Sequence, residues 1–172
     1  MRTLLTFLLA FSLAACGGSD TAPADEGASA SGSAATAQTG EVDRTITIEP
    51  VGNQMEYQQT EFAVAPGETV KLVFENTATA PSMQHNVVVL TEPPSQDVFR
   101  RIGEGGMEAG VAGDYVPDDP AILAYTPMSA PGETVEVTFT APEETGEYGY
   151  VCTFPGHWAT MNGTMRVTES PA

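Results

Sequence analysis

The stretch from residue 150 to residue 163, Tyr-Val-Cys-Thr-Phe-Pro-Gly-His-Trp-Ala-Thr-Met-Asn-Gly, constrains this chain more than any other part of its sequence. Cys152, His157 and Met161 lie there at intervals of five and four residues, with a Pro-Gly pair between the first two. A thiolate, two imidazoles and a weakly bound thioether form the donor set that holds copper as a one-electron carrier. The stretch supplies three of these four groups and predicts a metal site that needs a second imidazole.

The missing imidazole has one candidate. The sequence contains two histidines, His85 and His157, so a metal site of this kind requires His85. Taken alone, His85 is more readily interpreted as an ordinary core or surface histidine, and a buried cysteine is usually a small apolar side chain. The thioether has competitors as well, because Met165 belongs to an alternating strand pattern and Met83 follows a Pro-Ser pair. Met161 is therefore the favoured axial ligand.

Most of the chain after residue 44 shows the period of two that is typical of half-buried strands. This alternation predicts strands around residues 44–49, 55–57, 62–64, 70–74, 135–139, 148–152 and 164–168. The segment 86–90 is almost entirely apolar, as expected of a strand that is covered on both faces. His85 stands at the entrance of that strand, which is how the sheets are expected to bring it to the C-terminal stretch.

The hexapeptide Ala-Pro-Gly-Glu-Thr-Val occurs twice, at residues 65–70 and at residues 130–135. Proline and glycine at the two central positions favour a type II turn, because glycine accepts a positive φ without strain. Each copy leads into an alternating strand. We therefore interpret the two copies as equivalent corners of a two-sheet sandwich.

The strand rhythm stops in the middle of the chain, where residues 95–107 predict a short helix. Val98 and Ile102 lie four residues apart there, on one face of such a helix. Gly105 and Gly106 are expected to end it.

The copper-type stretch also carries a family resemblance. Cys-Thr-Phe-Pro-Gly-His followed four residues later by Met resembles the copper loop of the azurins, which are small blue copper proteins. Gln84-His85-Asn86 is similar to the His-Asn pair of that family, and residues 114–119 and 125–139 also look azurin-like. The resemblance covers roughly residues 42–168. It implies an all-β, Greek-key, two-sheet β-sandwich or barrel of the cupredoxin type, with a short helical insertion within residues 91–129.

The resemblance implies a ligand set for one type 1 copper ion per chain. The metal ligands would be His85, Cys152, His157 and Met161. In the azurins a backbone carbonyl just before the first histidine also approaches the metal. That residue is Gln84 here, where the family has glycine, so an additional side chain has to be accommodated beside the site.

Two neighbouring residues, Asn86 and Phe154, are candidates to orient the ligands and tune the site. The Asn86 side chain is a candidate to hydrogen-bond the copper loop, with a local backbone contact as the alternative. The Phe154 backbone N–H is a candidate donor to the sulfur of Cys152. Trp158 stands where the family usually has a small residue. It either extends the apolar patch at which redox partners dock in the family, or packs under the loop.

The N-terminus predicts export and membrane attachment. Residues 1–15 combine a positive start with a short apolar run, which is typical of a signal peptide and too short to span a membrane as a stable helix. Leu-Ala-Ala-Cys, ending at Cys16, resembles the lipobox of bacterial lipoproteins, in which the cysteine is acylated. The alternative is an ordinary cleaved signal with an unrelated cysteine. Residues 16–41 predict a lipid-anchored flexible linker, and residues 42–172 predict one cupredoxin domain.

The acidic composition limits the partners. The 172 residues include 23 acidic and 6 basic ones, which gives a formal net charge of −17. This charge argues against nucleic acid and against an anionic membrane surface as docking partners. A basic protein partner and simple solubility each explain it.

These features together predict a periplasmic, lipid-anchored electron carrier with type 1 copper, attached to the outer rather than the inner membrane. Its partners would be redox proteins such as c-type cytochromes, an oxidase or a reductase. We do not expect an enzyme, because the ligand set leaves no metal position open for a substrate. The alternatives are a copper chaperone or scavenger with an exchangeable site, and a metal-free sandwich that serves as a binding module.

Overall fold

The structure is a computed structural model and describes residues 41–171. The predicted signal peptide, the lipidation site Cys16 and all but the last residue of the predicted linker lie outside this range. The described part contains eight strands, one α-helix and two short 3-10 helices. In chain order these are β1 (Arg44–Ile48), β2 (Glu61–Val64), β3 (Thr69–Glu75), β4 (Val88–Leu90), α1 (Gln96–Ala109), η1 (Val111–Gly113), β5 (Ile122–Tyr125), β6 (Thr134–Thr140), β7 (Gly146–Val151), η2 (His157–Ala159) and β8 (Asn162–Val167).

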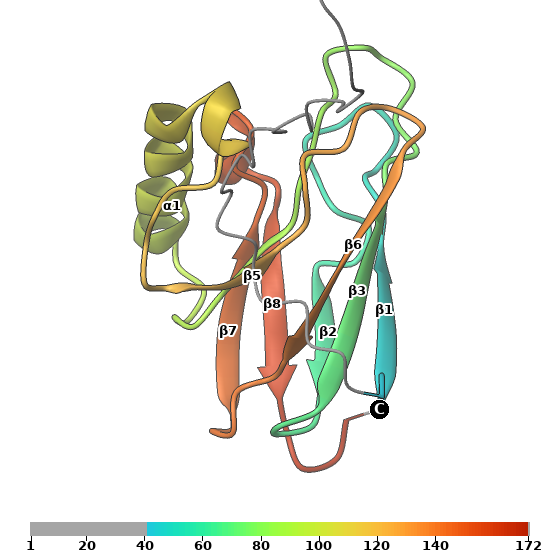
Figure 1. Cartoon of the computed structure of the whole chain (residues 1–172), viewed down its shortest axis with the longest axis vertical. Coiled ribbons are helices and arrows are strands. Elements are labelled where there is room, and N and C mark those ends of the chain that lie inside the picture. The colour runs from blue at the N-terminus through green and yellow to red at the C-terminus, as the bar shows by residue number, and fades with distance from the viewer. Residues whose placement is uncertain (1–40, 172) are drawn as a thin grey trace, which may run out of the picture. The chain divides into compact units, whose positions relative to one another are not determined.

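The strands form two mixed sheets. One has the order β1-β3-β6 and the other has the order β2-β8-β7-β4-β5. β1 runs parallel to β3 and β2 runs parallel to β8, whereas the remaining pairs are antiparallel. Figure 1 shows the two sheets and α1 beside the larger one. The predicted all-β two-sheet sandwich with one helical insertion is confirmed, and the sheets stay separate rather than closing into a barrel.

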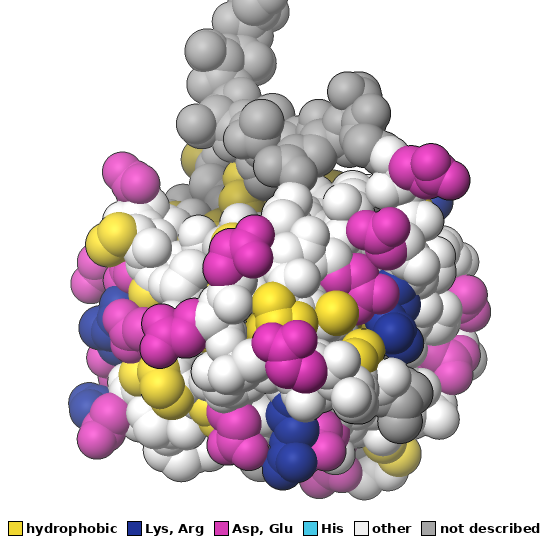
Figure 2. Space-filling model, turned by 90° about the horizontal axis from the view of Figure 1, so that it is seen from below, with side chains coloured by type: hydrophobic (Ala, Val, Ile, Leu, Met, Phe, Trp, Pro, Cys, Tyr) yellow, Lys and Arg dark blue, Asp and Glu magenta, His cyan; other side chains and the backbone are white. Residues whose placement is uncertain are grey.

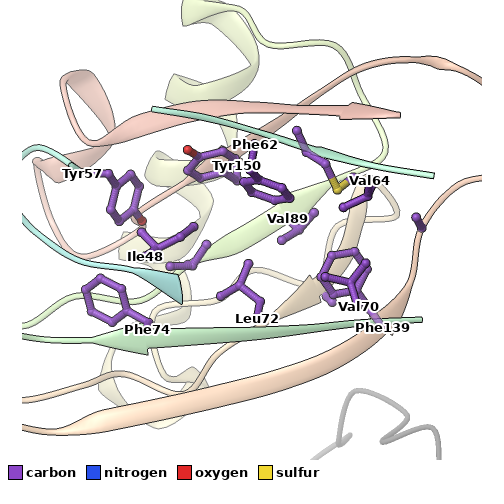
Figure 3. Close-up of a cluster of buried hydrophobic side chains, with 14 of the residues drawn as sticks. Ile48, Tyr57, Phe62, Val64, Val70, Leu72, Phe74, Val89, Phe139 and Tyr150 are labelled. Carbon is purple, nitrogen blue, oxygen red and sulfur yellow. The ribbon is translucent and has the colours of Figure 1, made fainter. Parts of the chain in front are cut away.

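The inward faces of the two sheets form the main core. Alternate residues of β3 point inward and are fully buried, while the residues between them are half-buried. β2, β4 and β7 contribute from the facing sheet, and Figure 3 shows their side chains Phe62, Val64, Val89 and Tyr150 in the space between the sheets. The largest buried members of this cluster are Ile48, Tyr57, Phe62, Leu72, Phe74, Phe139, Tyr150, Met161 and Met165.

Both copies of the repeated hexapeptide form the predicted turn. Gly67 and Gly132 have φ values of 68° and 84°, and each turn is closed by an N–H···O=C bond from its glutamate to its alanine, of 3.2 and 3.0 Å. The predicted placement of the turns is also confirmed. The first turn leads from β2 to β3 and the second lies between β5 and β6, so at each of them the chain passes from the larger sheet to the smaller one. Because β3 and β6 pair antiparallel, the two corners lie at opposite ends of the smaller sheet.

The strand predicted around Met55 and Tyr57 is wrong. Residues 51–60 are turns and bends, and Tyr57 makes only an isolated bridge to Pro50. Tyr57 is nevertheless buried, whereas Met55 is 43% exposed. A buried aromatic ring packed against Phe74 and Tyr150 therefore fixes this segment without a continuous ladder.

The helix forms as predicted, but its predicted end is wrong. α1 begins after the N-cap Ser95, whose hydroxyl accepts from the N–H of Val98, and continues through both central glycines to Ala109. Gly110 ends it with a φ of 58°. A Cβ at Gly106 would lie 3.0 Å from the Thr153 Cβ and closer still to the Tyr115 carbonyl oxygen. Glycine at position 106 thus permits close packing against the neighbouring loops instead of ending the helix.

Charged side chains are spread over the surface, with acidic ones in excess. Figure 2 shows one face on which Asp and Glu side chains are widespread and several stand next to Lys or Arg. The five Lys and Arg residues within residues 41–171 all make ion pairs: Arg44 with Glu68, Lys71 with Glu136, Arg100 with Asp97, Arg101 with Glu92 and Asp119, and Arg166 with Glu61 and Glu147. Among residues 41–171, no helix has the length and apolarity needed to cross a membrane.

Candidate metal centre

The pairing of β4 with β7 brings two distant parts of the chain together. Val88 pairs with Val151 in an antiparallel register, so His85 and Cys152 lie just beyond the paired ends. The predicted strand at 86–90 is shorter than expected and begins at Val88. His85 is held instead by a two-way backbone bridge to Ser129, with N···O distances of 3.1 and 2.8 Å. Its imidazole is thus fixed by backbone contacts before the strand begins.

Three donor atoms meet at this point. The Cys152 Sγ lies 3.9 Å from the His85 Nδ1 and 3.7 Å from the His157 Nδ1, and the two Nδ1 atoms are 3.1 Å apart. Cys152 and His85 are fully buried, and His157 is 4% exposed. Among the described residues this is the one group of three or more His, Cys, Asp or Glu side chains placed to hold a metal.

The size of this triangle fits a bound transition-metal ion. Typical metal–nitrogen and metal–sulfur bonds of about 2.05 and 2.3 Å with trigonal angles place the nitrogens about 3.5 Å apart and each nitrogen about 3.8 Å from the sulfur. The observed distances of 3.1, 3.7 and 3.9 Å are close to these values. Two imidazoles with one thiolate in a trigonal arrangement is the donor set that suits copper.

Met161 is tied to this group through the backbone. The Cys152 N–H donates to the Met161 carbonyl and the Met161 N–H donates to the His157 carbonyl, both at 2.9 Å. Its side chain is fully buried in the same apolar cluster as Cys152. Met165 lies in β8, opposite Tyr148 and facing the core. The structure therefore places Met161 beside the site and gives Met165 an ordinary core position.

A buried hydrogen-bond network connects the two ligand-bearing segments. The Asn86 side chain donates to the Thr153 hydroxyl at 2.8 Å and accepts from the Thr153 N–H at 2.9 Å. The Tyr57 hydroxyl donates to the Asn86 carbonyl at 2.6 Å. The sequence indicated Asn86 but not Thr153 or Tyr57. Their signals were weak, since Thr153 is one more small residue in the loop and Tyr57 lies in a wrongly predicted strand.

The helix packs directly against the loop. A Cβ at Gly103 would lie 2.7 Å from the Trp158 Cβ and closer still to its ring, so the indole rests on a gap in the helix surface. Gly106, one turn later, contacts Thr153 in the same way. Thr153 and Trp158 directly follow Cys152 and His157. Of the two readings of Trp158, the structure supports packing under the loop, where the ring joins the apolar cluster between α1 and the larger sheet.

Burial shifts the pKa of all three groups. It raises the pKa of the Cys152 thiol to about 12, although hydrogen bonds from the backbone N–H groups of Asn86 and Phe154 oppose this shift. It lowers the pKa of His85 to about 4, helped by the neighbouring His157, and lowers that of His157 to about 4. In the metal-free protein at neutral pH the sulfur is therefore protonated and both imidazoles are neutral.

Comparison with known proteins agrees with this geometry. The family model for copper binding proteins of the plastocyanin/azurin family matches residues 44–168. Auracyanin-A of Chloroflexus aurantiacus is 38% identical over 124 residues, which are 72% of this chain and 74% of that protein. The solved structure of auracyanin A, a "blue" copper protein, superposes with a TM-score of 0.65 at 38% identity and covers 72% of this chain and 98% of that one.

Two further relatives bear on the predictions. The azurin of Achromobacter denitrificans is 39% identical over 104 residues, which are 59% of this chain and 67% of that protein. Outer membrane protein H.8 of Neisseria meningitidis is 36% identical over 103 residues, which are 59% of this chain and 54% of that protein. The family match spans most of the chain and includes all three converging donors. This chain therefore belongs to the plastocyanin/azurin family of copper-binding proteins.

Proposed function

We propose that this protein is a blue copper electron carrier. The observation that carries the proposal is the convergence of Cys152, His85 and His157, buried and with their donor atoms 3.1–3.9 Å apart. Similarity to a blue copper auracyanin and to azurins supports it. In this proposal Met161 is the weak axial ligand, and the Gln84 carbonyl is a further weak contact.

Copper in this donor set supplies a one-electron couple when it is bound. The chain's own contribution is to hold the ligand positions constant. The two-way bond between Asn86 and Thr153 fixes the loop to the strand that carries His85, and burial excludes water from the three donors. With Met161 in the fourth position, no site remains for a substrate, so the proposed role is not enzymatic.

The direct test is the visible spectrum of the whole chain after addition of Cu(II). An intense thiolate-to-copper band is expected, and Cys152→Ser is expected to abolish it while leaving the β-sheet circular dichroism unchanged. Cys16→Ser is the matched control, because it removes the other cysteine of the sequence and should keep the band. A colourless product, or a band that survives Cys152→Ser, would refute the proposal.

A copper chaperone or scavenger is the alternative, and it requires ligands that exchange readily. The deep burial of the three donors favours the carrier. Transfer of Cu(I) from the reduced protein to a chelator separates the two functions. Slow loss, over hours at a chelator concentration well above that of the protein, is expected of the carrier. Rapid loss would favour delivery.

We further propose that the protein works in the periplasm, anchored to the outer membrane by lipid at Cys16. Residues 1–15 would be the signal peptide, residues 16–41 the linker and residues 42–172 the cupredoxin domain. The Leu-Ala-Ala-Cys sequence supports this arrangement, as does the similarity to outer membrane protein H.8. Cys16→Ser is expected to move the protein from the membrane fraction to the soluble fraction, whereas Cys152→Ser should leave it with the membrane. Equal partitioning of the two variants would contradict the anchor.

A further inference from the structure

A cavity of about 410 Å³ opens beside the metal loop. Gln84, which precedes His85, lines one side of it, and Phe154 of the loop lines another. Tyr115 adds a second aromatic wall, and Asp114 and Glu133 add two carboxylates. The cavity therefore combines aromatic surface, two negative charges and an amide directly next to the proposed electron-transfer site.

Within residues 41–171, no Lys or Arg forms an ion pair with either carboxylate. Each accepts one backbone N–H, Asp114 from Met128 and Glu133 from Ala130, both at 2.8 Å. All five Lys and Arg residues within residues 41–171 are paired with other acids, and none of them reaches either carboxylate. The described part of the chain thus leaves this negative charge unbalanced at the edge of the site.

The aromatic walls connect the cavity to a proposed ligand. The rings of Tyr115 and Phe154 meet edge to face with centroids 5.3 Å apart, and the Phe154 ring lies 4.9 Å from the His157 imidazole. A group docked against Tyr115 is therefore two ring contacts away from His157. His157 itself is only 4% exposed, so the Phe154 ring offers a contact to it from the cavity side.

The backbone that presents these groups is unusual. Asp114 and Tyr115 both have positive φ, 53° and 55°, a region that residues other than glycine seldom occupy. Such conformations persist where surrounding contacts impose them, and they gather at binding sites. Here the Asp114 carboxylate holds the Met128 N–H, and the Tyr115 N–H donates to the Gly110 carbonyl. Strained backbone thus turns one carboxylate and one ring toward the cavity.

We propose that this cavity receives a lysine or arginine side chain of a basic redox protein that exchanges electrons with this chain. The inference rests on the proposed electron-carrier function and adds the chemistry of its partner. Two carboxylates complement the positive charge, and the faces of Tyr115 and Phe154 attract a cation in addition. Complementary charge at an interface steers encounter and fixes the register of docking.

Binding of a basic c-type cytochrome to the metal-free whole chain tests the docking without involving copper. Amide NMR shifts at low ionic strength are expected to move most at Asp114, Tyr115 and Phe154. The double variant Asp114→Asn with Glu133→Gln should weaken binding roughly tenfold, since rim charges at close range each contribute severalfold. Val111→Arg, at an 80% exposed position that lines the same cavity, should weaken it as well.

The control is the double variant Glu143→Gln with Glu144→Gln, which removes the same two negative charges far from the cavity. Glu143 and Glu144 lie before the start of β7, whereas Cys152 of the metal site follows the end of that strand. This pair is expected to change the affinity less than twofold. Equal weakening by both pairs would mean that only the overall charge matters, and no weakening by the cavity pair would also overturn the proposal. Failure of the visible-band test above would refute the carrier function separately, because this titration needs no metal.

Discussion

Replacing Gly103 by alanine tests whether the contact between helix and loop is as tight as the structure indicates. The new Cβ would lie 2.7 Å from the Trp158 Cβ and closer still to the indole ring. Ordinary carbon–carbon contacts begin near 3.5 Å, so the two backbones must separate by about 0.8 Å. Rotation of the side chain gives no relief, because the Trp158 Cβ is fixed to its own backbone.

Two opposing terms set the size of the effect. Alanine stabilises a helix interior relative to glycine by about 1 kcal/mol, whereas overpacking a tight contact costs about 1–3 kcal/mol. We therefore expect Gly103→Ala to lower the free energy of unfolding by about 1 kcal/mol. Gly105→Ala is the matched control in the same helix. Its Cβ would meet Pro117 at 3.0 Å, a smaller overlap than the contact at Gly103, so this variant should be more stable than Gly103→Ala.

Denaturant unfolding of the whole chain, followed by tryptophan fluorescence, measures both effects. Trp158 is the single tryptophan of the sequence, so its emission reports directly on the contact with α1. Gly103→Ala is expected to shift the emission of the folded state to longer wavelength, and Gly105→Ala is not. A Gly103→Ala protein that is at least as stable as the parent, with unchanged emission, would refute the packing described here.

Three further results are expected. Met161→Leu should keep the visible band but move the reduction potential, because the axial ligand tunes it; an unchanged potential would assign that position to another group. Copper binding near pH 7 should release about one proton, measurable with an indicator in weak buffer, since the Cys152 thiol has a pKa of about 12 while both imidazoles are already neutral. The metal-free protein should lose stability in denaturant titrations as the pH falls from about 6.5 to about 4. His85 and His157 have pKa values of about 4 when folded, so the unfolded chain binds more protons in that range; a flat profile would contradict their burial.

Local signals in the sequence predicted much of the fold. In β3, β6 and β8, apolar and polar residues alternate because one face of each strand is buried, and this pattern is visible in the sequence. Each Ala-Pro-Gly-Glu turn is determined by its own four residues, so it could be predicted without tertiary information. Tertiary contacts decided the rest. No local sequence pattern indicates that Gly106 faces the Tyr115 carbonyl, or that Tyr57 is buried in an irregular segment.

The candidate site also has a part that the sequence predicted and a part that it did not. The spacing of Cys152, His157 and Met161 lies within one loop and was readable directly, and His85 followed because the sequence contains no third histidine. Thr153 and the cavity beside Phe154 depend on segments that are distant in the sequence. Such contacts form only when the strands have paired into sheets, so no periodicity or motif in the sequence could predict them.

The positions of the three donor residues along the chain determine when in folding the metal site can form. His85 comes from the middle of the chain and the other two from a loop that is anchored on both sides by β7 and β8, the last pair of strands. A growing or unfolded polypeptide therefore holds no finished binding pocket. The three donors come together only where β4 has paired with β7, so the sheets have to form before the copper site is complete.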